Sequence, residues 1–170
     1  METLRIILRT LHIISGTFWV GAAIFITLFL EPTVRNAGAV GGQFMERLIT
    51  ETPLVKYMTL FSLLTVITGV TLYGLDSRLT LSWIGTREGV IFTIGSLAGL
   101  VAYATGQFVI SPTAARIGAL GHEMALAGGP PSSFQLNEMS SLQGRATRFG
   151  RLELVLMIIS VAGMAGARLF

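Results

Sequence analysis

The sequence predicts an all-α integral membrane protein, a bundle of four transmembrane helices that forms one domain over residues 1–170. Hydrophobic residues make up 52% of the chain and charged residues only 12%, and the mean hydropathy is +0.71. A soluble domain carries about twice that share of charge. Four apolar runs approach the roughly 20 residues that an α-helix needs to cross the hydrocarbon core. Because backbone polar groups in lipid must be satisfied internally, these runs predict a helical bundle.

The predicted spans are residues 6–30, 57–75, 89–110 and 152–170. The first run is too long for the apolar part of a signal peptide, which is about 7 to 15 residues, so we expect a retained helix. Small and hydroxyl side chains in the second and third spans favour close helix packing and interhelical hydrogen bonds. The fourth run is the least apolar, because Glu153 and Arg168 lie near its two ends. We expect Gln107 and Glu153 to make a polar contact.

The connections between the spans define two sides of the membrane. Four crossings place both termini and the short loop 76–87 on one side, called side A here. Two long connections, residues 32–56 and 111–150, then lie on side B. Residues 43–49 form an amphipathic stretch that we expect to lie in the membrane interface. A breaker of glycine, proline and serine at residues 128–133 marks the second connection as irregular.

An internal echo suggests two repeated helical hairpins. Leu30-Glu31-Pro32-Thr33 closes the first predicted span, and Ile110-Ser111-Pro112-Thr113 closes the third. We expect both prolines to end their helices. Proline is common just after any helix, so chance explains the echo equally well.

The candidate chemistry lies on one face of the first span. Arg5, Arg9, His12, Gly16 and Trp19 recur at spacings of three and four, which places them on one side of a helix. An ionisable side chain inside a membrane is costly unless it is paired or functional, so His12 is the first functional candidate. The alternative is that His12 only forms a hydrogen bond to a Ser or Thr of a neighbouring helix.

Other candidates lie at the side A ends of the second and third spans. Tyr73 ends the second span, and Arg87 with Glu88 begins the third. Together with Arg9 and His12 they predict a side A pocket that offers an axial ligand, an aromatic ring and arginines for haem propionates or another anion. The alternative is that these arginines only reach to lipid headgroups.

Several chemistries are excluded or restricted. The chain has no cysteine, which excludes disulfides, iron–sulfur clusters and covalently attached c-type haem. The net charge of +3 contains no basic run suited to nucleic acid, so nucleic acid is not an expected partner. The other histidine, His122, belongs to side B and cannot share a metal with His12. His122, Glu123 and Met124 are a weak candidate for surface copper.

A resemblance to a known group rests on short motifs. Leu11-His12-Ile13-Ile14 followed by Trp19-Val20-Gly21 resembles the first helix of small bacterial membrane proteins, namely the CopD-like copper-resistance domain and the HemJ-type protoporphyrinogen oxidases. The resemblance implies a four-helix protein of the bacterial cytoplasmic (inner) membrane in which His12 is a haem b ligand or redox-site residue. At the start of the third span, the HemJ group has a lysine where this chain has Thr86-Arg87-Glu88, and arginine does not release a proton as lysine can.

The leading hypothesis is a small haem- or porphyrin-associated redox protein in the lipid bilayer. It assigns His12 as metal ligand and catalytic group, Glu88 as a second catalytic group, Arg9 and Arg87 as anion clamps, and Trp19 and Tyr73 as aromatic neighbours of the cofactor. Alternative hypotheses are a non-catalytic accessory subunit of a larger membrane complex, a homo-oligomer, and a copper-handling protein. The sequence does not decide whether the protein is an enzyme.

Overall fold

The protein is an elongated bundle of helices in a computed structural model that describes residues 2–78 and 80–167. Within those residues the chain contains no β-strand. The helical elements are α1 (Glu2–Phe25), η1 (Ile26–Leu30), α2 (Glu31–Asn36), α3 (Gly38–Thr50), α4 (Leu54–Ser77), α5 (Leu81–Ile84), α6 (Arg87–Thr105), η2 (Gly106–Ile110), α7 (Ser111–Leu126) and α8 (Ser133–Gly166).

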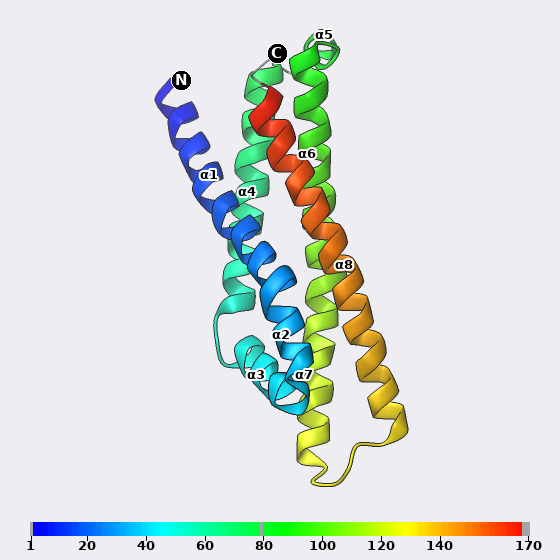
Figure 1. The fold of residues 1–170 in the computed structure, drawn as a ribbon. Helices are drawn as coiled ribbons and strands as arrows, with labels where there is room; N and C mark the ends of the chain where they lie inside the picture. The colour runs from blue at the N-terminus through cyan, green and yellow to red at the C-terminus, as the bar shows by residue number, and fades with distance from the viewer. Residues whose placement is uncertain (1, 79, 168–170) are drawn as a thin grey trace.

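Four continuous helices are long and apolar enough to cross a membrane, which confirms the predicted all-α membrane bundle. They cover Glu2–Asn36, Leu54–Ser77, Arg87–Leu126 and Ser133–Gly166. Large apolar side chains remain exposed along all four, as expected for surfaces that contact lipid rather than water. The described ends of α1 and α8 lie at the same end of the bundle as α5, and α3 lies toward the other end (Figure 1).

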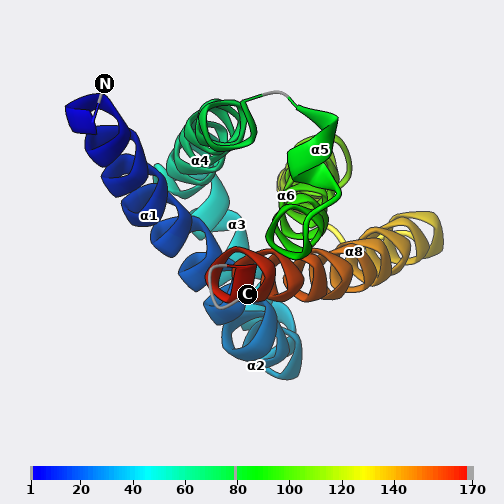
Figure 2. The ribbon, with the colours of Figure 1, turned by 90° about the horizontal axis from the view of Figure 1, so that it is seen from above.

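The helices associate chiefly in two pairs. α1 packs along α4, and α6 packs along α8; Figure 2 shows α8 running past α6, with its C-terminal end toward α1, when the bundle is seen from above. The α6–α8 pair is in close contact because Gly95 and Gly163 face each other. A Cβ on Gly163 would lie 2.9 Å from the Gly95 Cα. The central core contains Trp19, Ala23, Ala102 and Met157.

The prediction that Pro32 and Pro112 end their helices is wrong. Each proline lies in the first turn of a helix, α2 or α7, that directly continues a π-helical turn, η1 or η2. Proline has no N–H, and its ring clashes with the carbonyl four residues earlier in a regular α-helix. The wider π-turn lets the chain continue without that α-helical hydrogen bond. The internal echo therefore corresponds to one local structure that occurs twice.

The prediction of a long irregular connection over residues 111–150 is also wrong. Only residues 127–132 between α7 and α8 are non-helical. Ser132 begins α8 with a capping box that includes Gln135, so the polar stretch before the fourth predicted span belongs to the same helix. Glu153 therefore lies well inside α8 and not at its end. Residues 168–170 of that predicted span lie outside the described residues.

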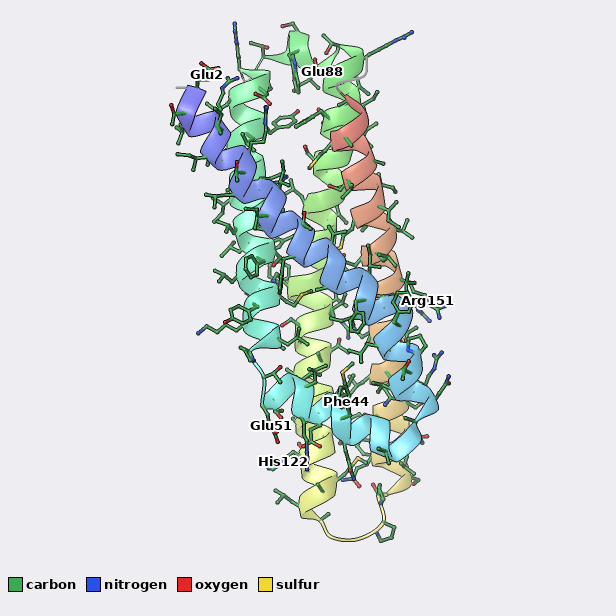
Figure 3. The ribbon with its side chains drawn as sticks, turned by 60° about the vertical axis from the view of Figure 1, so that its left-hand side comes forward. Glu2, Phe44, Glu51, Glu88, His122 and Arg151 are labelled. Atoms are coloured by element: carbon green, nitrogen blue, oxygen red, sulfur yellow. The ribbon has the colours of Figure 1, made fainter. Side chains whose placement is uncertain are left out.

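The continuous helix Arg87–Leu126 and its neighbour α8 extend beyond the hydrocarbon core on side B. At 1.5 Å per residue, the 40 residues from Arg87 to Leu126 span about 60 Å, roughly twice the hydrocarbon thickness. Arg116 on α7 lies in this extension and forms ion pairs with Glu123 and with Glu138 of α8, at 2.9 and 2.8 Å. The amphipathic stretch at 43–49 lies within α3, beside this end of the bundle (Figure 3).

Candidate functional site

His12 lies half-buried between α1 and α4 in the side A half of the membrane. Its Nδ1 atom is 2.9 Å from the backbone carbonyl of Thr65 and 3.2 Å from Oγ1 of Thr68. A carbonyl oxygen can only accept a hydrogen bond, so Nδ1 carries the proton. In the neutral ring the lone pair is then on Nε2, for which the described residues provide no hydrogen-bond partner. Metal-ligating histidines commonly have this arrangement.

Small and hydroxyl side chains hold the imidazole in place. Gly69 lies directly against the ring, where a Cβ would come within 2.8 Å of Cε1. One turn farther along α1, the buried Ser15 hydroxyl lies 2.9 Å from Oγ1 of Thr65. The hydrogen bonds of His12 to α4 are also what the structural alternative expects. The ring is positioned rigidly whichever role it has.

A charged cavity opens one to two helical turns nearer to side A than His12, which is not part of its lining. Arg5 and Arg9 of α1 both approach the Asp76 carboxylate of α4, at 3.3 and 3.8 Å. The cavity has a volume of about 540 Å³, and its lining consists of Arg5, Arg9, Leu75, Asp76, Arg78, Trp83, Glu88 and Ala167. Three arginines face two carboxylates there, so the lining has an excess of one positive charge and favours an anion.

Asp76 is a site residue that the sequence analysis did not name. An acidic residue at the side A end of the second span, with Arg5 and Arg9 near the same end of the first, is the pattern that predicts this contact.

The predicted site residues do not all meet in this cavity. Arg9 and Glu88 line it, and His12 lies just below Arg9 on the same helix face. Arg87 is exposed at the first position of α6. The Tyr73 hydroxyl lies 2.7 Å from Oγ1 of Thr93, and its ring contacts Trp83 and Phe92. The structure thus brings Arg9 and Glu88 to one cavity, leaves Arg87 and His12 outside its lining, and places Tyr73 in an aromatic cluster with Trp83.

Trp19 lies in the bundle core, nearer to side B than His12. It is 5% exposed and packs edge-on against Tyr103. Its indole N–H lies within reach of the carboxyl group of Glu153 on α8. The expected contact between Gln107 and Glu153 is not the one that forms, because the Gln107 amide donates to Ser62 Oγ at 3.3 Å.

Glu153 is the second ionisable group that the structure places inside the bundle. Its side chain is 8% exposed. One carboxyl oxygen packs against the facing helix at Gly106, where any larger residue would collide with it. A Cβ on Gly106 would be 2.8 Å from that oxygen. From the sequence, Glu153 is expected only to make a polar contact with Gln107 near side B, and no local pattern marks it as buried.

His122 lies far from His12, near the opposite end of the bundle from Glu2 and Glu88 (Figure 3). Among the residues that the structure describes, no three His, Cys, Asp or Glu side chains lie close enough to hold one metal ion. The Glu123 carboxylate next to His122 is paired with Arg116.

The fold and these two sites define a class, a four-helix integral membrane protein with a histidine in one half of its bundle and a buried glutamate in the other. Comparisons of the chain with protein-family models, with curated proteins and with solved structures find no match.

Proposed function

We propose that this protein binds haem b in a bacterial cytoplasmic membrane, that His12 would hold its iron, and that its function is redox chemistry. The observation that carries the proposal is the hydrogen bond from His12 Nδ1 to the Thr65 carbonyl. That bond leaves Nε2 as the lone-pair donor at membrane depth, and imidazole is a common haem ligand. The motif around His12 and Trp19 supports the bacterial location through its resemblance.

The surroundings of His12 support haem as the ligand. An imidazole that holds the iron would need a fixed orientation, which Thr65 and Gly69 provide. Haem propionates need cations at the membrane surface, and Arg5 and Arg9 lie one to two turns from His12 toward side A. Asp76 holds both arginines in position. Arg87 supplies a further cation at the same end of the bundle.

The protein residues then have distinct roles. The haem, when bound, supplies one-electron chemistry between ferric and ferrous iron. The Thr65 carbonyl keeps the proton on Nδ1, so that Nε2 is the ligating atom and the ring does not rotate. Arg5 and Arg9 bind anionic groups at the surface. Glu88, at the cavity wall, is the group that accepts or releases protons there.

Absorption spectra of the detergent-purified protein, oxidised and dithionite-reduced, test this proposal. We expect a Soret band in the wild type after haem addition, and its loss in His12→Ala. His122→Ala is the matched control, because His122 is exposed on α7, and its spectrum should equal that of the wild type. Added imidazole should restore part of the band in His12→Ala. A wild type that gains no Soret band, or an unchanged band in His12→Ala, would overturn the proposal.

A further inference from the structure

The Glu153 carboxyl group lies inside the hydrocarbon core, in the half nearer to side B. α4 is the helix whose length best matches the bilayer, since its 24 residues span about 36 Å. Ser62 of α4, which accepts the hydrogen bond from Gln107, lies eight residues, or about 12 Å, from the side B end of that helix. Glu153 faces Gly106, the residue next to Gln107, so it lies at a similar depth.

No cation neutralises Glu153 within the described part of the chain. The ion pairs there involve Arg5, Arg9 and Arg116, and none of them includes Glu153. The donor within its reach is the uncharged indole of Trp19. An unpaired carboxylate in a dry helix interface is strongly unfavourable, so this group needs a positive partner from outside the chain.

The titratable groups of the packed elements do not supply that partner. On α6, Tyr103 packs against Trp19, and η2 contains no titratable residue. On α1, His12 lies seven positions before Trp19 and hydrogen-bonds to α4. On α2, Glu31 binds Thr147. On α7, Arg116 is paired with two glutamates. On α8 itself, Arg148 and Arg151 are exposed.

A polar seam connects Glu153 with side B. Gly150 and Thr147 lie three and six positions before Glu153 on α8, about one and two helical turns nearer to side B. Gly150 faces Thr27 of η1, whose hydroxyl would be 3.7 Å from a Cβ at that glycine. The Thr147 hydroxyl donates a hydrogen bond to the carboxylate of Glu31. Small and hydroxyl side chains thus lead from the buried carboxyl group to a second, partly exposed one.

Both π-turns border this arrangement. η2 contributes Gly106, which contacts Glu153, and η1 contributes Thr27, which lies along the seam. π-turns inside α-helices are often found at functional sites because they redirect side chains and free backbone groups. One π-turn therefore contacts the buried carboxyl group, and the other lies along the seam that leads from it.

We propose that Glu153 is an intramembrane proton-binding site that exchanges protons with side B along the seam ending at Glu31. In the uptake step a proton from water at side B reaches a carboxyl oxygen of Glu153, and the carboxylate becomes a neutral acid. Release reverses this step. The Trp19 N–H lies beside the Glu153 carboxyl group. An N–H can donate to a carboxyl oxygen but cannot bind a metal ion, and a site for such an ion needs several oxygen ligands. This inference does not depend on haem binding.

Infrared spectroscopy of the full-length protein in lipid tests the proposal. At neutral pH we expect the carbonyl band of a protonated carboxylic acid, which shifts in deuterated water and is lost in Glu153→Gln. The amide of that variant keeps an acceptor for Trp19. Glu123→Gln is the control, because Glu123 is exposed and paired with Arg116, and it should retain the band. Glu31→Gln should retain the band and slow its deuterium shift several-fold.

Two outcomes would overturn the proposal, namely no acid band in the wild type and a band that persists in Glu153→Gln. A band that sodium ions remove at constant pH would also overturn it, since the site would then bind a metal cation. If Glu153→Gln does not fold, labelling of the wild type with a hydrophobic carbodiimide replaces it. The reagent adds to protonated carboxyl groups in lipid, and mass spectrometry should find the adduct on Glu153. Absence of that adduct would contradict the proposal.

Discussion

At the scale of single residues, the function of each polar side chain depends on one or two contacts. A backbone carbonyl orients His12. Every residue of α4 has such a carbonyl, so the feature specific to this position is the space that Gly69 leaves for the imidazole. Any side chain at residue 69 would occupy the space of the imidazole. Gly106 has the same relation to Glu153. In both cases a missing side chain on one helix makes room for an ionisable group on another.

Gly69→Ala should displace His12 and destabilise the protein. The new Cβ would lie 2.8 Å from Cε1 and 3.2 Å from Nδ1, which forces the ring away from the Thr65 carbonyl. We expect the free energy of unfolding to fall by about 1 to 3 kcal/mol, as for overpacked cores. Unfolding by SDS in mixed micelles measures it. Gly21→Ala is the control, since nothing lies within 4 Å of that Cβ position. Equal stabilities of the two variants would contradict this account of the site.

At the scale of helices, apolar periodicity predicts the spans well and their ends poorly. Each predicted span lies within an observed helix, over the described residues. The ends differ because Pro32 and Pro112 follow π-turns and because the polar residues before Glu153 continue α8. Local composition shows where the chain changes from apolar to polar. In a long helix that change marks the membrane surface and not the end of the helix.

Gly163→Ala should weaken the α6–α8 pair. Its Cβ would come within 2.9 Å of the Gly95 Cα and 3.1 Å of the Ile91 carbonyl oxygen, and a backbone cannot move aside as a flexible side chain can. Close approach of backbones is what small residues permit between membrane helices. We expect a loss of about 1 to 3 kcal/mol in unfolding free energy. Gly144→Ala, on the same helix with nothing within 4 Å, should change it little. A comparable loss in both variants would show that helix propensity, not packing, is responsible.

At the scale of the whole molecule, four crossings divide the protein into two polar ends. The charged cavity with Arg5, Arg9 and Asp76 lies at side A, and the Arg116 ion pairs lie at side B. Between them, His12 lies near the middle of α4, beside Thr65 and Thr68, and Glu153 lies nearer to side B. The molecule thus holds two ionisable groups at different depths in the bundle.

Cysteine labelling tests this topology directly, because the chain has no native cysteine. Ser82 in α5 and Ser133 at the start of α8 are both exposed, and they lie at opposite ends of the bundle (Figure 1). A membrane-impermeant maleimide should label Ser82→Cys from one side of the membrane and Ser133→Cys from the other. Labelling of both variants from the same side would contradict a four-span protein.

The sequence by itself determined the class of the protein, the four spans and the helix face that carries Arg5, Arg9 and His12. Those features follow from hydropathy and from the 3.6-residue period, which are local properties of a helix. Only the tertiary structure decided that Asp76 meets the two arginines and that Trp19 and Gly106 meet Glu153. These partners are distant in the chain. Their meeting depends on where helices cross and on how the π-turns rotate the following residues, which no local pattern records.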